Sequence, residues 1–189
     1  GEHDQIYSAV PYWGLSTVLM PYMTSKGYES YAASVGPLSS AWDRACELYA
    51  QLTGTVTDYG EEHSKRCRHA RYGEDFSSDP LIDEWSAEEK INLLGHSFGG
   101  VTVRLLAELM ANGSEAERKA SGDDVSDLFT GGKGDWIYSV TALAAPHNGT
   151  TAYLIREARL KDINATAEER AFIAMLTVAT APHLDRALS

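Results

Sequence analysis

A serine flanked by glycines lies near the middle of the chain, where residues 95–99 have the sequence Gly-His-Ser-Phe-Gly. The apolar residues 91–94 before it are typical of a short buried strand, and a helix with one apolar face is expected from Val101 to Met110. A serine on such a strand-to-helix turn is exposed at the edge of the sheet, and small neighbours leave room for the turn. The pattern therefore predicts that Ser97 is a nucleophile.

The backbone N–H of Phe98 would lie in the first turn of that helix. There it could donate a hydrogen bond to the oxyanion that forms when a serine attacks an ester, with help from the positive end of the helix dipole. A phosphate-binding loop also needs glycines, but it would place a lysine before a serine or threonine, and residues 99–101 contain none. A purely structural serine in a glycine-rich turn is the other interpretation.

A serine nucleophile needs a histidine base and a carboxylate that orients the base. When the serine lies on a strand-to-helix turn of this kind, the acid and then the histidine follow it in the chain. Only His147 and His183 follow Ser97. His147 comes directly after a strand expected at 136–144, but no intervening carboxylate is convincingly placed. We therefore expect His147 to be a neighbour of the site and not its base.

The composition favours one domain with a substantial core, since the chain has 189 residues of which 43% are hydrophobic. Its 16 basic and 27 acidic residues give a net charge of −11, and no basic stripe is present that could bind nucleic acid.

No apolar segment approaches the roughly 18 residues of a membrane span, and residues 1–5 lack a signal pattern. Cys46 and Cys67 have no CxxC spacing and are expected to be free thiols.

The periodicity of apolar residues predicts alternating helices and strands. Such an order is typical of an α/β fold with a mostly parallel sheet and flanking helices. The polar segment 60–89 has no sustained period and is predicted to be a long excursion from this fold. Apart from the elements beside Ser97, the predicted elements are a helix at 12–26, a strand at 28–35, a helix at 42–59 with Ser40 as its N-cap, and the strand at 136–144.

Several long motifs occur in an order that resembles the large secreted lipases of the staphylococcal and thermophilic Bacillus/Geobacillus type. The resemblance covers nearly the whole chain. The motifs are Tyr12-Trp13-Gly14, Val35-Gly36-Pro37-Leu38-Ser39-Ser40, Trp42-Asp43-Arg44-Ala45-Cys46-Glu47, residues 95–100, Asn112-Gly113, Leu128-Phe129-Thr130-Gly131-Gly132 and Ala145-Pro146-His147-Asn148-Gly149-Thr150.

The resemblance implies an α/β-hydrolase fold that is incomplete at both ends, with residues 1–189 forming one partial lipase domain. The acid and base of the triad are then expected beyond residue 189, and the second oxyanion donor before residue 1. The resemblance also implies secretion and the start of a lid at 151–189, although residues 171–179 equally suit an ordinary core helix. The chain alone is accordingly expected to hydrolyse esters poorly.

The expected activity is therefore hydrolysis of carboxylic esters, such as triacylglycerols at an oil-water interface, through a serine acyl-enzyme. A noncatalytic binding domain that keeps the same turn is one alternative. An acyltransferase is another, because attack by an alcohol instead of water needs only a different acceptor site. The sequence gives no oligomeric state.

The resemblance also implies a zinc site. Asp43, His63 and His69 match three of the family's ligands, and one carboxylate with two imidazoles suits Zn²⁺. The zinc-binding excursion would span about residues 43–89, and the fourth ligand would lie outside the chain. Without the resemblance, the same residues would be typical of a solvated surface. The family also binds calcium, but no calcium ligand is identified in this sequence.

Overall fold

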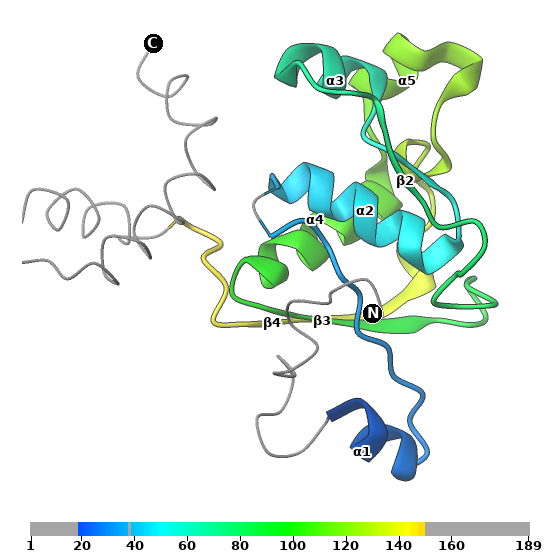
Figure 1. Cartoon of the computed structure of the whole chain (residues 1–189), viewed down its shortest axis with the longest axis vertical. Coiled ribbons are helices and arrows are strands. Elements are labelled where there is room, and N and C mark those ends of the chain that lie inside the picture. Colours follow the sequence, from blue (N-terminus) through cyan, green and yellow to red (C-terminus); the bar gives the residue numbers. More distant parts are fainter. Residues whose placement is uncertain (1–18, 38, 150–189) are drawn as a thin grey trace, which may run out of the picture.

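The structure is a computed structural model that describes residues 19–37 and 39–149 (Figure 1). The expected lid at 151–189, His183 and residues 12–18 of the first predicted helix lie outside the described residues. The helices are α1 (Leu19–Ser25), α2 (Ala41–Thr53), α3 (Glu61–Cys67), α4 (Phe98–Asn112) and α5 (Glu115–Ser121). The strands are β1 (Val56–Asp58), β2 (Tyr72–Asp75), β3 (Ile91–His96) and β4 (Ile137–Leu143), and three short 3₁₀ turns lie between α5 and β4.

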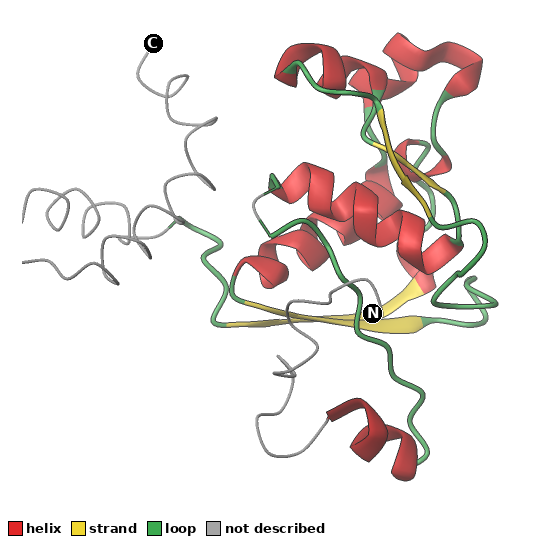
Figure 2. Ribbon diagram, viewed as in Figure 1, coloured by secondary structure: helices red, strands yellow, loops and turns green. Residues whose placement is uncertain are grey.

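Strands β3 and β4 pair in parallel, with Leu93 opposite Val140 and His96 opposite Leu143. The connection between them includes α4, which packs against both strands, and α2 packs on α4 (Figure 2). This strand-helix-strand unit confirms the predicted α/β class and the parallel pairing. The carboxyl ends of the two strands therefore meet at one edge, and α4 begins at this edge directly after β3.

The core lies between α2 and α4, where both helices present their apolar faces to each other. Leu106 and Met110 of α4 are fully buried, as are Ala45 of α2 and Phe129 of a 3₁₀ turn. Tyr49 and Leu52 continue the buried face of α2 at the spacing of three and four residues that a helix requires. Asp43, in the first turn of α2, and Ser97, directly before the first turn of α4, are thus supported by one packed layer.

Two predicted elements are corrected. The helix predicted at 42–59 ends at Thr53, because Gly54 adopts a left-handed conformation (φ 63°) and donates its N–H to Ala50 O. Ser40 caps the start of α2 as predicted. The strand predicted at 28–35 is not formed, since Ser34 bonds through both its N–H and its carbonyl to the side chain of Gln51 and not to another strand.

The predicted polar excursion contains more regular structure than its sequence suggested. β1 and β2 form an antiparallel pair, and α3 lies between them in the sequence. α3 packs against α5 (Figure 1). Trp85, in the loop before β3, donates its indole N–H to Trp136 O at 2.9 Å. The later end of the excursion is therefore attached to the segment directly before β4. No helix among the described residues is long and apolar enough to cross a membrane.

Candidate active site and metal centre

Ser97 lies on the turn that joins β3 to α4, as predicted. Its backbone has φ 54° and ψ −126°, a conformation that residues with a side chain rarely adopt. The turn is held on both sides, since Ser97 N donates to Leu143 O of β4 at 2.8 Å and Gly100 N donates to Ser97 O at 3.0 Å. Ser97 is exposed at the carboxyl edge of the parallel pair.

Two of the three neighbouring glycines are required by space. A Cβ on Gly95 would lie 2.2 Å from Gly99 O, and a Cβ on Gly100 would lie 2.5 Å from the Cβ of Ala145. A Cβ on Gly99, by contrast, would meet no atom within 4 Å. The turn therefore needs glycine at 95 and 100, as expected from the sequence, but among the described residues nothing requires it at 99.

Phe98 is the first residue of α4, so its N–H belongs to the helical turn that lacks intrahelical partners. Its ring is 39% exposed and lies 5.1 Å from the guanidinium of Arg44. Arg44 also donates from Nε to Thr102 Oγ1 at 3.0 Å, and Thr102 is buried in α4. The first turn of α2 is therefore connected to the turn that presents Ser97.

His147 follows β4 and is exposed. The structure records no hydrogen bond between His147 and Ser97, although both are described. Its backbone N–H instead donates to Ala145 O at 3.0 Å in a local turn. The interpretation of His147 as a neighbour of the site, and not as its base, stays a prediction.

The three predicted zinc ligands lie together. Asp43 Oδ1 is 2.8 Å from His63 Nε2 and 3.7 Å from His69 Nε2, although twenty residues separate Asp43 from His63. Asp43 belongs to the first turn of α2, His63 to α3, and His69 to the turn after α3. One carboxylate oxygen therefore faces two imidazole nitrogens.

The carboxylate of Asp43 is fixed by its role at the end of a helix. Ser40 and Asp43 form a reciprocal capping box, with Asp43 N donating to Ser40 Oγ at 3.1 Å. Burial alone would raise the pKa of Asp43, but hydrogen bonds with His63 and Ser40 outweigh burial and lower it below its ordinary value. The oxygen that faces the histidines is therefore held as an anion.

The imidazole rings are also held in place. His63 is buried and stacks on Trp42, with ring centroids 5.3 Å apart. His69 has Nδ1 2.8 Å from the carbonyl oxygen of Ala70, which fixes the proton on Nδ1 and leaves the lone pair on Nε2. Nε2 is the nitrogen that faces Asp43, so the ring is oriented as a metal ligand would be.

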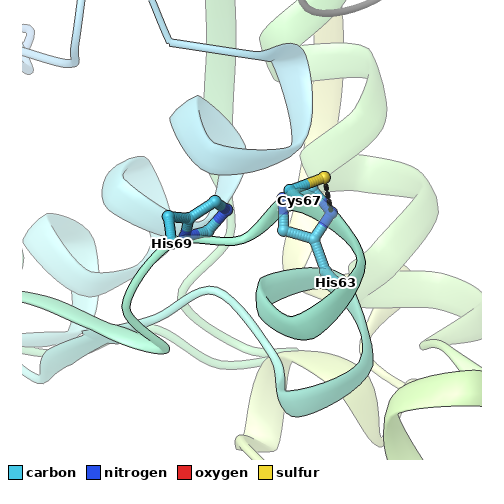
Figure 3. Close-up of side chains that lie close together, drawn as sticks. All are labelled: His63, Cys67 and His69. Carbon is cyan, nitrogen blue, oxygen red and sulfur yellow. Dashed lines mark hydrogen bonds between the residues drawn. The ribbon is translucent and has the colours of Figure 1, made fainter.

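Cys67 lies beside these histidines and was not predicted as a site residue (Figure 3). Its Sγ is 3.8 Å from His63 Nδ1, and one possible ligand atom from each of His63, Cys67 and His69 lies within 4.8 Å of the other two. The sequence does contain one sign of this proximity, the spacing of four residues between His63 and Cys67. Such a spacing brings two side chains together only when the segment is a helix. Because segment 60–89 was predicted without regular structure, that spacing was not interpreted.

Glu117 of α5 is the second residue that sequence reasoning missed. Its side chain is 1% exposed, and its two carboxylate oxygens accept the N–H groups of Glu62 and His63, each at 2.9 Å. These N–H groups lie in the first turn of α3, which has no side-chain cap of its own. Glu117 therefore positions the helix on which His63 lies, without contacting the imidazole. Its position after Gly113-Ser114 gave no signal for this long-range contact.

Comparisons with known proteins agree with the resemblance drawn from the motifs. The family model described as "Lipase-like, C-terminal domain" matches residues 3–163. Lipase 2 of Staphylococcus aureus is 39% identical over 145 residues, which are 75% of this chain and 21% of that protein. The Staphylococcus epidermidis lipase matches with the same identity and coverage. The chain thus spans about a fifth of the length of these relatives.

Solved structures give the same result for the fold. The Staphylococcus hyicus lipase aligns with a TM-score of 0.73 and 34% sequence identity, over 91% of this chain and 43% of that chain. EstA from Clostridium botulinum aligns with a TM-score of 0.74 and 40% identity, over 90% of this chain and 38% of that chain. The arrangement of helices and strands is therefore shared with the solved structures of a lipase and of EstA.

Proposed function

The chain belongs to the family of lipase-like C-terminal domains, and from this membership we propose that it forms part of a carboxylic-ester hydrolase of the α/β-hydrolase fold. The observation that supports the proposal best is the backbone of Ser97, whose positive φ on the turn between β3 and α4 exposes a serine hydroxyl. The substrate class is lipid esters, and the resemblance to secreted lipases supports action outside the cell.

The reaction follows from the groups at this edge. Ser97 Oγ attacks the carbonyl carbon of the ester and passes its proton to a general base, which the described residues do not place at the serine. The carbonyl oxygen becomes an oxyanion, and the N–H of Phe98 donates to it. Loss of the alcohol leaves an acyl-enzyme on Ser97, and water then releases the fatty acid.

Labelling with a fluorophosphonate tests the role of Ser97. We expect the probe to modify Ser97 in the 189-residue chain faster than exposed serines such as Ser77, because the turn and the helix end stabilise the negative charge that develops on the phosphonyl oxygen in the transition state as fluoride leaves. Ser97→Ala should remove this label. Equal rates at Ser97 and Ser77, measured by peptide mass spectrometry, would contradict activation of Ser97 by the turn and the helix end.

Product analysis then separates hydrolysis from acyl transfer. With 4-nitrophenyl butyrate and an added alcohol, a hydrolase releases butyrate, whereas an acyltransferase forms the new butyrate ester in excess. Any turnover should be lost in Ser97→Ala. Turnover that survives this substitution would contradict the assignment of Ser97.

We also propose that Asp43, His63 and His69 bind a zinc ion. The donor set supports this, because one carboxylate oxygen and two imidazole nitrogens are ligands that Zn²⁺ accepts in tetrahedral sites. The capping of Asp43 by Ser40 and the orientation of His69 by Ala70 hold these ligands in place. The ion would connect α2 to the excursion and so stabilise the fold.

Metal titration of the metal-free chain tests the site. We expect one Zn²⁺ to bind per chain and to raise the thermal denaturation temperature, and Asp43→Asn or His69→Ala to weaken binding strongly. Glu61→Gln, a change of similar size at a half-buried residue on the same helix as His63, is the matched control and should bind zinc as the unmodified chain does. Equal zinc affinity in His69→Ala and the unmodified chain would contradict the proposal.

A further inference from the structure

Arg44, a half-buried residue in the first turn of α2, contacts the start of α4 at two points. Its Nε donates to Thr102 Oγ1 at 3.0 Å, and its guanidinium carbon lies 5.1 Å from the centre of the Phe98 ring. Thr102 Oγ1 in turn donates to Phe98 O at 3.1 Å. Arg44 therefore reaches the ring of Phe98 directly and its carbonyl group through one hydroxyl.

The guanidinium of Arg44 is anchored by a further contact. Its Nη1 donates to the carbonyl oxygen of Gly36, in the segment before α2, at 3.2 Å. Thr102 is 2% exposed, so its hydroxyl bonds within the protein and not to bulk water. A planar guanidinium can donate in its plane and stack its face on a ring at the same time, which an ammonium group cannot do. These contacts hold the Arg44 side chain in one orientation against Phe98.

The N–H of Phe98 belongs to the peptide group that joins Ser97 to Phe98. The carbonyl oxygen of this trans peptide, Ser97 O, accepts the N–H of Gly100 at 3.0 Å. Because the peptide is planar, the N–H points away from that oxygen, and its direction depends on how the residues on both sides are held. Ser97 has a strained backbone (φ 54°), which persists only where the surroundings fix it. Phe98, on the other side, is the residue that Arg44 and Thr102 contact.

We propose that Arg44 is a positioning residue for ester hydrolysis at Ser97, because by holding Phe98 it keeps the Phe98 N–H directed at the oxyanion. The inference rests on the proposed function and adds a residue that acts through Phe98 and not on the ester itself. An oxyanion donor stabilises the transition state fully only when it is aligned before the charge develops. A small rotation of this N–H therefore slows the reaction even though the nucleophile is unchanged.

The rate at which a fluorophosphonate labels Ser97 measures this effect in the 189-residue chain, because negative charge develops on the phosphonyl oxygen as fluoride leaves. Arg44→Met keeps the length of the side chain and removes the guanidinium. We expect it to slow the labelling by about tenfold, less than the roughly 10²–10³-fold that loss of a whole donor costs, because the N–H is still present.

Two more variants separate position from charge. Arg44→Lys keeps the positive charge but lacks the Nε–H and the planar group, so it should label Ser97 as slowly as Arg44→Met does. Thr102→Val preserves the shape of the side chain but cannot link Arg44 to Phe98 O, and it should also label slowly. Thr102→Val carries the same test if Arg44→Met does not fold. Labelling of Arg44→Lys at the rate of the unmodified chain would overturn the inference, because charge alone would then suffice.

Arg71→Met is the matched control. Arg71 also lies over a ring, 4.8 Å from the centre of Tyr72, and it also bonds to another element, with Nη2 2.8 Å from Asp58 Oδ2. Because these contacts lie within the excursion, Arg71→Met should lower the denaturation temperature but label Ser97 at the rate of the unmodified chain. Circular dichroism at the labelling temperature checks that each variant is folded.

The direction of the Phe98 N–H can also be measured without any reaction. The sequence contains four phenylalanines, so a chain labelled with ¹⁵N-phenylalanine gives few amide signals, and Phe98→Leu identifies the signal of Phe98 by its loss. In a weakly aligned sample, the residual dipolar coupling of an N–H depends on its orientation. We expect Arg44→Met and Thr102→Val to change the coupling of Phe98 and to leave that of Phe76, directly after β2, unchanged.

Slow labelling together with a changed Phe98 coupling would support the inference. An unchanged labelling rate in folded Arg44→Met would overturn it. Slow labelling with an unchanged coupling would overturn it too, because Arg44 would then not act through this N–H. If Ser97 of the unmodified chain is labelled no faster than Ser77, the proposed activation of Ser97 fails. A changed coupling in Arg44→Met would then still support the role of Arg44 in directing the N–H, and an unchanged one would contradict it.

Discussion

The buried carboxylate of Glu117 accepts the backbone N–H of His63 at 2.9 Å, across fifty-four residues of sequence. A second oxygen accepts the N–H of Glu62 at the same distance. Glu117→Ala would leave both N–H groups without a partner, and an unsatisfied buried group costs about 1–3 kcal/mol. We expect a loss of about 2–4 kcal/mol in the free energy of unfolding, measured by urea denaturation of the metal-free chain.

Glu115→Ala on the same helix is the control for this change. Glu115 is exposed and pairs with Lys119 one turn away, an interaction worth about 0.3–0.5 kcal/mol. It should therefore unfold at almost the same urea concentration as the unmodified chain. If the two variants were equally stable, Glu117 would not be the cap of α3.

Gly95 and Gly99 are expected to respond oppositely to the same substitution. Gly95→Ala places a Cβ 2.2 Å from Gly99 O, a rigid backbone atom, so the turn must distort and the chain should lose about 3 kcal/mol or fail to fold. Gly99→Ala meets open space in the first turn of α4 and should be neutral, or stabilising by up to about 1 kcal/mol. Thermal denaturation of both variants measures the contrast.

Ser97 stores backbone strain at φ 54° that a glycine would relieve. Relative to Ser97→Ala, we expect Ser97→Gly to be more stable by about 1 kcal/mol, after allowing for the greater freedom of glycine in the unfolded chain. Both variants lack the hydroxyl and should be inactive. A Ser97→Gly variant less stable than Ser97→Ala would show that the turn is not strained.

The environment of Tyr49 leads us to expect a loss of folding stability at alkaline pH. Burial, together with the charge of Asp127 and a hydrogen bond to it, raises the pKa of Tyr49 well above its ordinary value of 10.0. Above about pH 10 the unfolded chain ionises this phenol while the folded chain does not, so folding stability is complete below pH 10 and falls as pH rises further.

Tyr49→Phe is the variant that isolates this effect. Between pH 9 and 11 its unfolding free energy should fall less steeply than that of the unmodified chain, because the phenylalanine does not ionise. The comparison is made by urea denaturation at each pH. Parallel pH profiles for the two chains would contradict the contribution of Tyr49.

The sequence predicted the elements whose signals are local. Ser40 as N-cap, β3, α4 and β4 follow from capping and periodicity within a few residues, and the parallel pairing follows from their order. The strand expected at 28–35 is not formed, and the backbone of Ser34 bonds instead to the side chain of Gln51, a tertiary contact that periodicity does not report. The helix predicted at 42–59 ends early because the left-handed conformation of Gly54 closes it, and periodicity does not report such a conformation.

The same distinction applies to the candidate sites. Ser97 could be predicted, since the glycines and flanking apolar residues lie within ten positions of it. Asp43, His63 and His69 were identified through the resemblance, and the structure brings them together. Cys67 was missed because its spacing from His63 has meaning only once α3 is known. Glu117 was missed because its partners are more than fifty residues away.

Asp43 and Arg44 are consecutive residues in the first turn of α2, yet they serve different sites. Asp43 faces the two histidines, while Arg44 contacts Phe98 and Thr102 of the helix that follows Ser97. The proposed metal site and the turn that presents Ser97 are therefore connected through one helical turn. A variant library that changes the proposed metal ligands should be screened for ester hydrolysis at the same time, because a change in this turn can alter both proposed sites.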